Sequence, residues 1–136
     1  TRRVMAHKVA TTLEACHAVE IMREALARYG TPEIVNTDQG SQFTAEDFTA
    51  VVLESGARLS MDGRGAWRDN VFVERLWRSV KYEHVYKYAY ASVSDARTKI
   101  AGYLDWYNKG RAHSSIENQT PEEAYWSGLP ALKTAA

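Results

Sequence analysis

The chain's most informative stretch reads Glu33-Ile34-Val35-Asn36-Thr37-Asp38-Gln39-Gly40. Residues 33–37 predict a short apolar strand, and this strand runs directly into the carboxylate of Asp38. A side chain at the carboxyl end of a strand lies where α/β folds expose their chemistry. We therefore predict a strand at 33–37 and a candidate acidic site at Asp38.

Helical and strand patterns alternate along the rest of the chain. Residues 3–10 show weak strand patterning, and a helix capped by Thr12 is expected to end at Gly30. A helix from Thr44 to Glu54 precedes a strand at 57–61, a glycine-rich loop at 62–68 and a long helix at about 69–86. Two more helices follow, one opened by Ser94 and one started by a capping box at 120–123 and ending near residue 128. Strands separated by helices predict a layered α/β domain.

Length and composition favour one compact domain. The 136 residues are 45% hydrophobic, which is enough to form a single buried core. The 17 basic and 17 acidic residues cancel, so a strongly basic DNA-coating protein is disfavoured. Bases nevertheless outnumber acids between Arg58 and Lys87, where they can neutralise phosphates or form an ordinary solvated helix face. With no membrane-spanning run and no signal-peptide pattern, we expect an intracellular, cytoplasmic protein.

The helix at 69–86 carries a second candidate acid, Glu74. A turn of about 100° per residue places five side chains on one face that we expect to be buried: Val73, Leu76, Trp77, Val80 and His84. Glu74 lies on the flank of that face with Asn70 and Lys81, and Arg78 follows one step further round. On this helix alone, a weak surface pair between Glu74 and Arg78 is the simpler interpretation. Asp38 and its flanking residues instead favour a functional role for Glu74.

Several other side chains are predicted to be structural. The single cysteine, Cys16, rules out an internal disulfide and is expected to be a buried, inert thiol. His17 shares no metal-ligand spacing with the other histidines. Eight aromatic residues can stack on bases, but their helical spacing favours packing in the core: Trp77, Tyr82, Tyr86, Tyr88, Tyr90, Tyr103, Trp106 and Tyr107.

Four segments agree in order and spacing with one protein family. They are Asn-Thr-Asp-Gln-Gly-Ser-Gln-Phe at 36–43, Asp-Asn-Val-Phe-Val-Glu-Arg-Leu-Trp at 69–77, Tyr-Asn-Lys-Gly-Arg-Ala-His at 107–113 and Thr-Pro-Glu-Glu at 120–123. Together they resemble the integrase catalytic core of insertion-sequence transposases that are related to retroviral integrases. Thirty-five residues separate Asp38 from Glu74, the spacing that names the family's aspartate-aspartate-glutamate triad.

The resemblance implies a ribonuclease H-like fold and a DNA transposase or integrase that cleaves and transfers DNA strands. Phosphodiester chemistry builds negative charge at phosphorus, which two Mg²⁺ or Mn²⁺ ions can stabilise, and hard ions prefer carboxylate ligands. Asp38 and Glu74 are then the catalytic, metal-binding residues. DNA contacts are implied for Asn70, Arg78, Lys81, Arg111 and His113, although a hydrogen-bonded structural role for His113 carries equal weight.

The sequence departs from the family pattern at its start. No acid before Asp38 matches the first aspartate, and the first two strands are also missing. We expect residues 1–136 to form the C-terminal portion of the catalytic domain, with a C-terminal extension at about 107–136. Such a fragment should be inactive alone and should form homo-oligomers that cover its sheet edges. The alternatives are a non-catalytic DNA-binding remnant and a nuclease for RNA–DNA hybrids, which the C-terminal signature disfavours.

Overall fold

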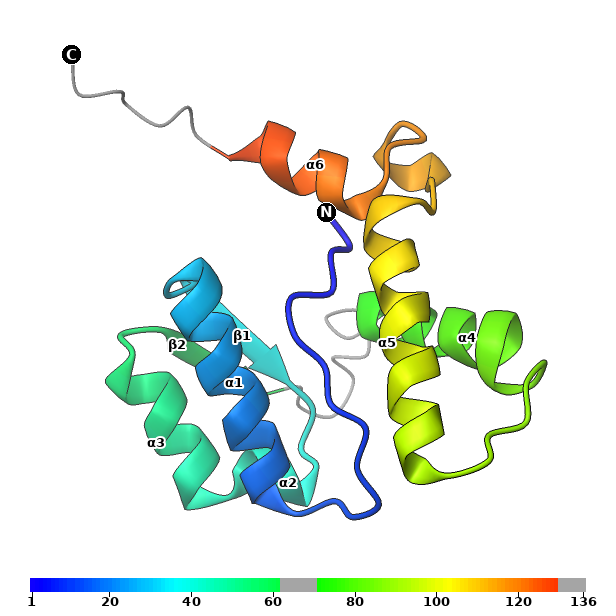
Figure 1. The fold of residues 1–136 in the computed structure, drawn as a ribbon. Coiled ribbons are helices and arrows are strands. Elements are labelled where there is room, and N and C mark those ends of the chain that lie inside the picture. The colour runs from blue at the N-terminus through cyan, green and yellow to red at the C-terminus, as the bar shows by residue number, and fades with distance from the viewer. Residues whose placement is uncertain (62–70, 130–136) are drawn as a thin grey trace.

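The computed structural model describes residues 1–61 and 71–129. Its helices and strands form two groups, and the N-terminal segment runs between them (Figure 1). The first group holds β1, β2, α1, α2 and α3, and the second holds α4, α5 and α6. No helix among the described residues is long and apolar enough to cross a membrane.

A two-stranded parallel sheet organises the first group. β1 (Ile34–Thr37) pairs with β2 (Arg58–Met61), with Ile34 opposite Arg58 and Thr37 opposite Met61. Parallel strands need a crossover, which α2 (Ser41–Thr44) and α3 (Glu46–Glu54) supply. α1 (Ala15–Tyr29) packs against α3. The strands predicted at 33–37 and 57–61 are thus confirmed, each one residue shorter at its start.

The second group consists of helices. α4 (Val71–Val80) continues into a π-helical turn, η2 (Lys81–Val85). α5 (Val93–Lys109), a 3₁₀ turn, η3 (Ser114–Ile116), and α6 (Pro121–Gly128) follow. The helix predicted at about 69–86 is therefore an α-helix and a π-turn in series, and its first two predicted residues lie outside the described part of the chain.

Among the described residues, the buried side chains form two apolar clusters rather than the single core that was predicted. One apolar cluster joins α1 to α3 and consists of Ala18, Phe48, Val52 and Ala57. The other joins α4 to α5 and consists of Val80, Tyr103, Leu104 and Tyr107. The described sheet has two strands of four residues each, so it is too narrow to connect both helical groups through one interior.

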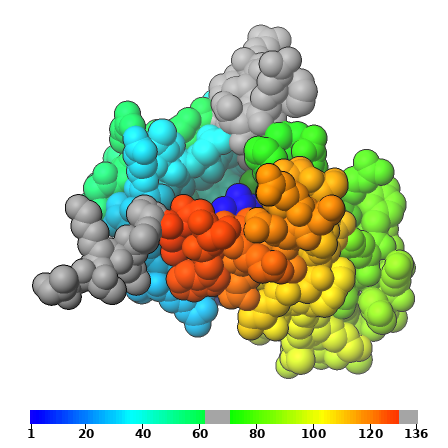
Figure 2. Space-filling view, turned by 90° about the horizontal axis from the view of Figure 1, so that it is seen from above, coloured from blue at the N-terminus to red at the C-terminus, as the bar shows by residue number. Residues whose placement is uncertain are grey.

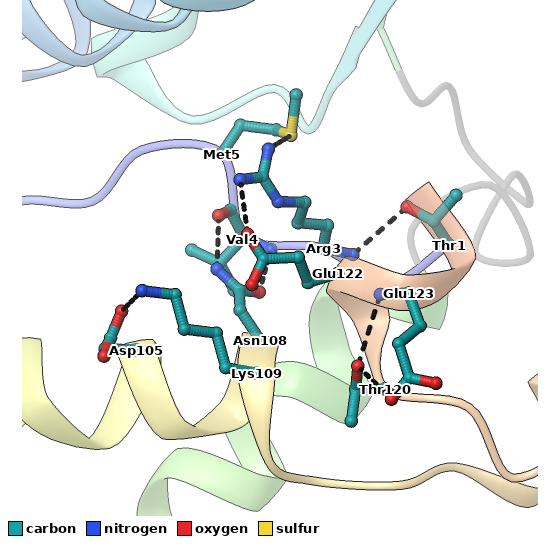
Figure 3. A network of polar contacts seen from close by, with 10 residues as sticks. All are labelled: Thr1, Arg3, Val4, Met5, Asp105, Asn108, Lys109, Thr120, Glu122 and Glu123. Atoms are coloured by element: carbon teal, nitrogen blue, oxygen red, sulfur yellow. Dashed lines mark hydrogen bonds and ion pairs between the residues drawn. The ribbon is translucent and has the colours of Figure 1, made fainter. Parts of the chain in front are cut away.

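The N-terminal segment links the two groups without forming a strand, which corrects the prediction for 3–10. The Asn108 side chain takes the place of a neighbouring strand. Its amide group accepts a hydrogen bond from the Val4 N–H and donates one to the Val4 C=O, each at 2.8 Å (Figure 3). The guanidinium of Arg3 forms an ion pair with Glu122 at 3.4 Å. It also lies over the rings of Tyr29 in α1 and Tyr125 in α6, 4.7 and 4.6 Å from their centroids. Side chains, rather than a β-ladder, therefore fix this segment.

Three predicted helix starts are displaced. Glu14, not Thr12, is the N-cap of α1, and the Thr12 hydroxyl instead lies 3.0 Å from His17 Nε2. Thr44 is the last residue of α2. Ser92, rather than Ser94, caps α5 by accepting the Asp95 N–H at 3.0 Å. The predicted capping box at Thr120 is confirmed, since its hydroxyl accepts the Glu123 N–H (Figure 3).

Candidate active site and nucleic-acid interface

Asp38 lies immediately after β1, as predicted. Thr37 closes the strand with a buried side chain, whereas Asp38 is exposed. The Asp38 Oδ1 atom accepts the Gly40 N–H at 2.8 Å, which forms a tight local turn. A Cβ added at Gly40 would lie 2.9 Å from that oxygen and 2.8 Å from Gln42 Oε1. Glycine at position 40 therefore lets the backbone approach the Asp38 carboxylate closely.

Glu74 lies in the first turn of α4 and is exposed. A carboxylate in a helix's first turn is favoured by the partial positive charge of the N-terminal N–H groups. Within the described part of the chain, no ion pair joins Glu74 to Arg78, whose guanidinium instead lies 5.6 Å from the Tyr82 ring centroid. The simple surface pair that the helix alone suggested is not formed.

One open groove of about 580 Å³ brings together three of the predicted site residues, Glu74, Arg78 and Lys81. Three aromatic residues, Trp77, Tyr82 and Tyr86, complete its lining. All six positions recur at three- and four-residue steps, so they share one side of α4 and η2. The predicted site residue Asn70 lies outside the described residues.

The aromatic residues of this groove correct the prediction that they pack in the core. Trp77, Tyr82 and Tyr86 are 55%, 61% and 66% exposed. Outside the groove, Tyr88 and Trp106 are also exposed, whereas Tyr103 and Tyr107 are buried as expected. The predicted buried face of the helix holds only in part, because Val73 and Trp77 are exposed while Val80 is buried. Helical spacing predicts which side chains share a face, but not which faces other elements cover.

The π-turn η2 lies at the end of the groove. The Tyr86 N–H bonds the carbonyl of Lys81 at 2.9 Å, five residues back, and such turns are frequent at functional sites. Glu83, the middle residue of this turn, is held by hydrogen bonds from residues outside the turn. Arg111 Nε donates to both carboxylate oxygens of Glu83, at 2.7 and 3.0 Å, and the Tyr103 hydroxyl donates to one of them at 2.8 Å.

His113 extends this network and is only 4% exposed. Arg111 Nη1 donates to its Nδ1 atom at 2.9 Å, and Arg2 Nη1 lies 3.3 Å from the same atom. Because guanidinium groups only donate, Nδ1 is the unprotonated nitrogen of a neutral ring. Burial, and then the charges of Arg111 and Arg2, lower the pKa of His113 below its usual value.

The sequence analysis missed two members of this network, Glu83 and Tyr103. A signal for Glu83 was present, since a turn of about 100° per residue places it beside Leu76, at the edge of the apolar side of the helix. A carboxylate on a packing face needs a partner, and Arg111 is that partner. For Tyr103, burial raises the pKa of the hydroxyl well above its usual range, and the hydrogen bond to Glu83 adds to this effect.

A second prediction fails at the start of α1. Cys16 is exposed rather than buried. Its Sγ atom lies 3.6 Å from the Glu14 carboxylate, and ligand atoms of Glu14, Cys16 and His17 lie within 4.8 Å of one another. His17 thus lies beside two potential metal ligands, a proximity that histidine spacing did not predict. Asp38 and Glu74 do not belong to this group.

The two acids of the predicted site offer donors that fit a hard divalent cation. Both carboxylates are exposed, and the hydrogen bond from Gly40 engages only Oδ1 of Asp38. Oxygen donors of this kind are the ligands that Mg²⁺ and Mn²⁺ prefer. The convergence of Asp38 with Glu74 on shared ions stays a prediction.

Comparison with solved structures identifies the fold. The chain is similar to the catalytic core domain of BIV integrase, with a TM-score of 0.68 and 21% sequence identity over 88% of this chain and 76% of that one. The fold is therefore that of a retroviral integrase core, which is ribonuclease H-like. The predicted fold class is confirmed.

Sequence relatives lead to the same family. The transposase of insertion sequence element IS904 from Lactococcus lactis subsp. lactis is 31% identical over 91 residues, 66% of this chain and 36% of the relative. The uncharacterized 31 kDa protein of insertion element IS600 from Shigella sonnei is 33% identical over 89 residues, 65% of this chain and 33% of the relative. The chain thus spans about a third of the length of these relatives.

Family models account for most of the described residues. One model described as "Integrase core domain" matches residues 1–66, and a second with the same description matches residues 55–121. The first match includes Asp38 and the second includes Glu74, Arg111 and His113. The chain belongs to the integrase core domain family.

Proposed function

We propose that this chain contributes to a transposase that cleaves DNA strands and joins them to target DNA. One observation carries the proposal: an exposed carboxylate, Asp38, directly follows strand β1, while a second, Glu74, shares a groove with two cations, Arg78 and Lys81. Acidic ligands beside phosphate-binding cations are what phosphodiester chemistry requires.

Asp38 and Glu74 are the residues that would hold the divalent ions, with a further aspartate needed to complete the set. Mg²⁺ or Mn²⁺ bound there would supply Lewis-acid chemistry at the phosphate that reacts. This chain's own contribution is to orient the two carboxylates. The Gly40 N–H holds one oxygen of Asp38, and the helix start of α4 presents Glu74 to solvent.

Arg78 and Lys81 are the proposed phosphate contacts, together with Asn70. Within the described residues, neither Arg78 nor Lys81 takes part in an ion pair, so both charges are available to a phosphate backbone. Arg111 and His113 instead direct their side chains to Glu83 and to each other. This favours a positioning role for them, and direct DNA contact by these two residues stays a prediction.

Metal-dependent DNA binding tests the proposal. We expect Mg²⁺ to strengthen binding of a labelled duplex, and we expect Asp38→Asn or Glu74→Gln to abolish that increment. Glu54→Gln, which removes an exposed acid at the end of α3, serves as the matched control. Binding that ignores Mg²⁺ in every variant would instead support the non-catalytic DNA-binding alternative.

Catalysis by this chain alone is not expected, because two carboxylates do not fix a metal pair. Nicking should require a segment that supplies the first aspartate. Mg²⁺-dependent strand transfer by the purified 136-residue chain would contradict this part of the proposal. Self-association also stays a prediction, and the exposed side chains of Phe72 and Val73 on α4 support it.

A further inference from the structure

The groove on α4 and η2 contains more aromatic surface than phosphate binding requires. Tyr82 and Tyr86 are 61% and 66% exposed, and both line the same groove as Arg78 and Lys81. Large exposed aromatic side chains that gather beside cations are a typical feature of surfaces that bind unpaired nucleic acid. These rings therefore require an explanation beyond the backbone contacts proposed above.

The two tyrosine rings hold each other in a fixed arrangement. Their centroids are 5.3 Å apart and their planes meet at 90°, an edge-to-face pair. The Arg78 guanidinium lies over the Tyr82 ring, 5.6 Å from its centroid. Tyr82 and Tyr86 are four residues apart, so their side chains lie on one side of the helix. A ring held by its neighbours loses little side-chain entropy when a ligand stacks on it.

We propose that Tyr82 and Tyr86 form a stacking platform for unpaired DNA bases, while Arg78 and Lys81 bind the phosphates of the same strand. This proposal rests on the proposed function, since it names the form of DNA that the groove accepts. A base inside a duplex has both faces covered by its neighbours, so only a splayed or single-stranded base can stack on a side chain. The partner is thus a frayed or single strand that passes about two to three helical turns from Glu74, in the groove that Glu74 also lines.

Charge supports this occupant over an apolar protein segment. Two cations without a described ion-pair partner face the groove, and an apolar segment would bury them at a cost. A polyanion with flat aromatic bases satisfies the cations and the rings together. Because every base has a π-face, such a platform binds strands with little sequence preference.

The test distinguishes binding to the bases from binding to the phosphates. A labelled oligothymidylate is compared with a strand of equal length that carries abasic sites, so that the phosphates are the same in both. We expect the 136-residue chain to bind the oligothymidylate roughly five- to a hundred-fold more tightly, the range that stacking of one base provides. Tyr82→Leu should remove most of this preference and Tyr82→Phe should keep it, because phenylalanine retains the ring.

Two further variants control the comparison. Arg78→Gln should weaken binding of both strands by similar factors and leave their ratio unchanged. Tyr88→Leu, which removes an exposed tyrosine outside the groove, should change neither value. Far-ultraviolet circular dichroism of each variant verifies that it is folded.

Each remaining outcome overturns a stated part of the proposal. Equal affinity for the two strands, or a preference that survives Tyr82→Leu, would contradict the stacking platform while leaving the transposase proposal intact. Failure of the folded chain to bind either strand or the duplex would contradict both. A clear preference for the duplex would show that the groove binds phosphates alone.

Discussion

Single residues set the geometry of the candidate site, and Gly40 is under a tight steric constraint. A Cβ at this position would lie 2.9 Å from the Asp38 Oδ1 atom, closer than side-chain atoms normally approach. Gly40→Ala should therefore displace the carboxylate and weaken Mn²⁺ binding several-fold, with little change in the free energy of unfolding.

An electron paramagnetic resonance titration of free Mn²⁺ measures this effect. Gly102→Ala is the control, since a Cβ there meets no atom within 4 Å. It lies inside α5, so it should stabilise the fold by roughly 1 kcal/mol and leave Mn²⁺ binding unchanged. Wild-type Mn²⁺ affinity in Gly40→Ala would show that the turn does not orient Asp38.

His113 makes the stability of the fold depend on pH, and the stability should fall as the pH falls. Its pKa in the folded chain is lowered, whereas an unfolded histidine keeps a pKa of about 6.5. The unfolded chain therefore binds more protons as the pH falls below that value. The stability provided by the neutral ring is complete above about pH 6.5 and is lost as the pH falls towards the lower, folded pKa.

Urea denaturation at about pH 7.5 and about pH 5.5 tests this sign. We expect the free energy of unfolding to fall with pH more steeply in the wild type than in His113→Asn, which cannot gain a proton. The variant should also be less stable at the higher pH, because His113 is buried. Parallel pH profiles for the two proteins would argue against a neutral His113 in the folded chain.

At the scale of elements, the link between the π-turn and the segment that follows α5 controls where the groove's residues lie. Glu83 and Arg111 come from segments 28 residues apart, and their side chains are 31% and 28% exposed. Removing either partner leaves a partly buried charge without its hydrogen bonds, so Glu83→Gln and Arg111→Ala should each lower stability by about 2 kcal/mol.

A double-mutant cycle isolates the pair. Because both substitutions break the same interaction, the double variant should be hardly less stable than either single variant. The interaction energy between Glu83 and Arg111 should be about 1–3 kcal/mol. Lys99→Ala breaks the exposed pair with Asp95 and should cost less than about 1 kcal/mol. Additive effects of Glu83→Gln and Arg111→Ala would mean that the two side chains stabilise the fold separately.

The elements also show what the sequence can predict. Apolar runs bounded by turn residues identify β1 and β2, and the capping box identifies the start of α6. Thr12 fails as a cap because its hydroxyl finds the His17 ring instead. The exposure of Trp77 and Tyr82 could not be predicted, since periodicity assigns side chains to a face without saying what covers it. Likewise, the contact between Arg111 and Glu83 spans 28 residues and depends on packing alone.

At the scale of the whole molecule, the N-terminal segment joins two separate apolar clusters. Asn108 binds both backbone groups of Val4, and Arg3 contacts aromatic rings from α1 and α6. Asn108→Ala should cost about 2 kcal/mol, because two partly buried hydrogen bonds are lost. The two groups should then unfold less cooperatively.

Hydrogen exchange of α1 and α5 amides measures this coupling. In the Asn108→Ala variant we expect the two helices to differ in protection more than in the wild type. Asp105→Ala provides a control on the same helix, since it breaks the exposed pair with Lys109. Unchanged protection in both helices of the Asn108→Ala variant would mean that the segment does not couple the groups.

The most direct test asks whether Asp38 and Glu74 bind the same ions. Mn²⁺ broadens the nuclear magnetic resonance signals of nearby amides, so the Gly40 and Arg75 amides report on the two carboxylates separately. We predict that both signals broaden at the same Mn²⁺ concentration and that Asp38→Asn relieves the broadening at both. Broadening at Arg75 that persists unchanged in Asp38→Asn would contradict a shared metal site.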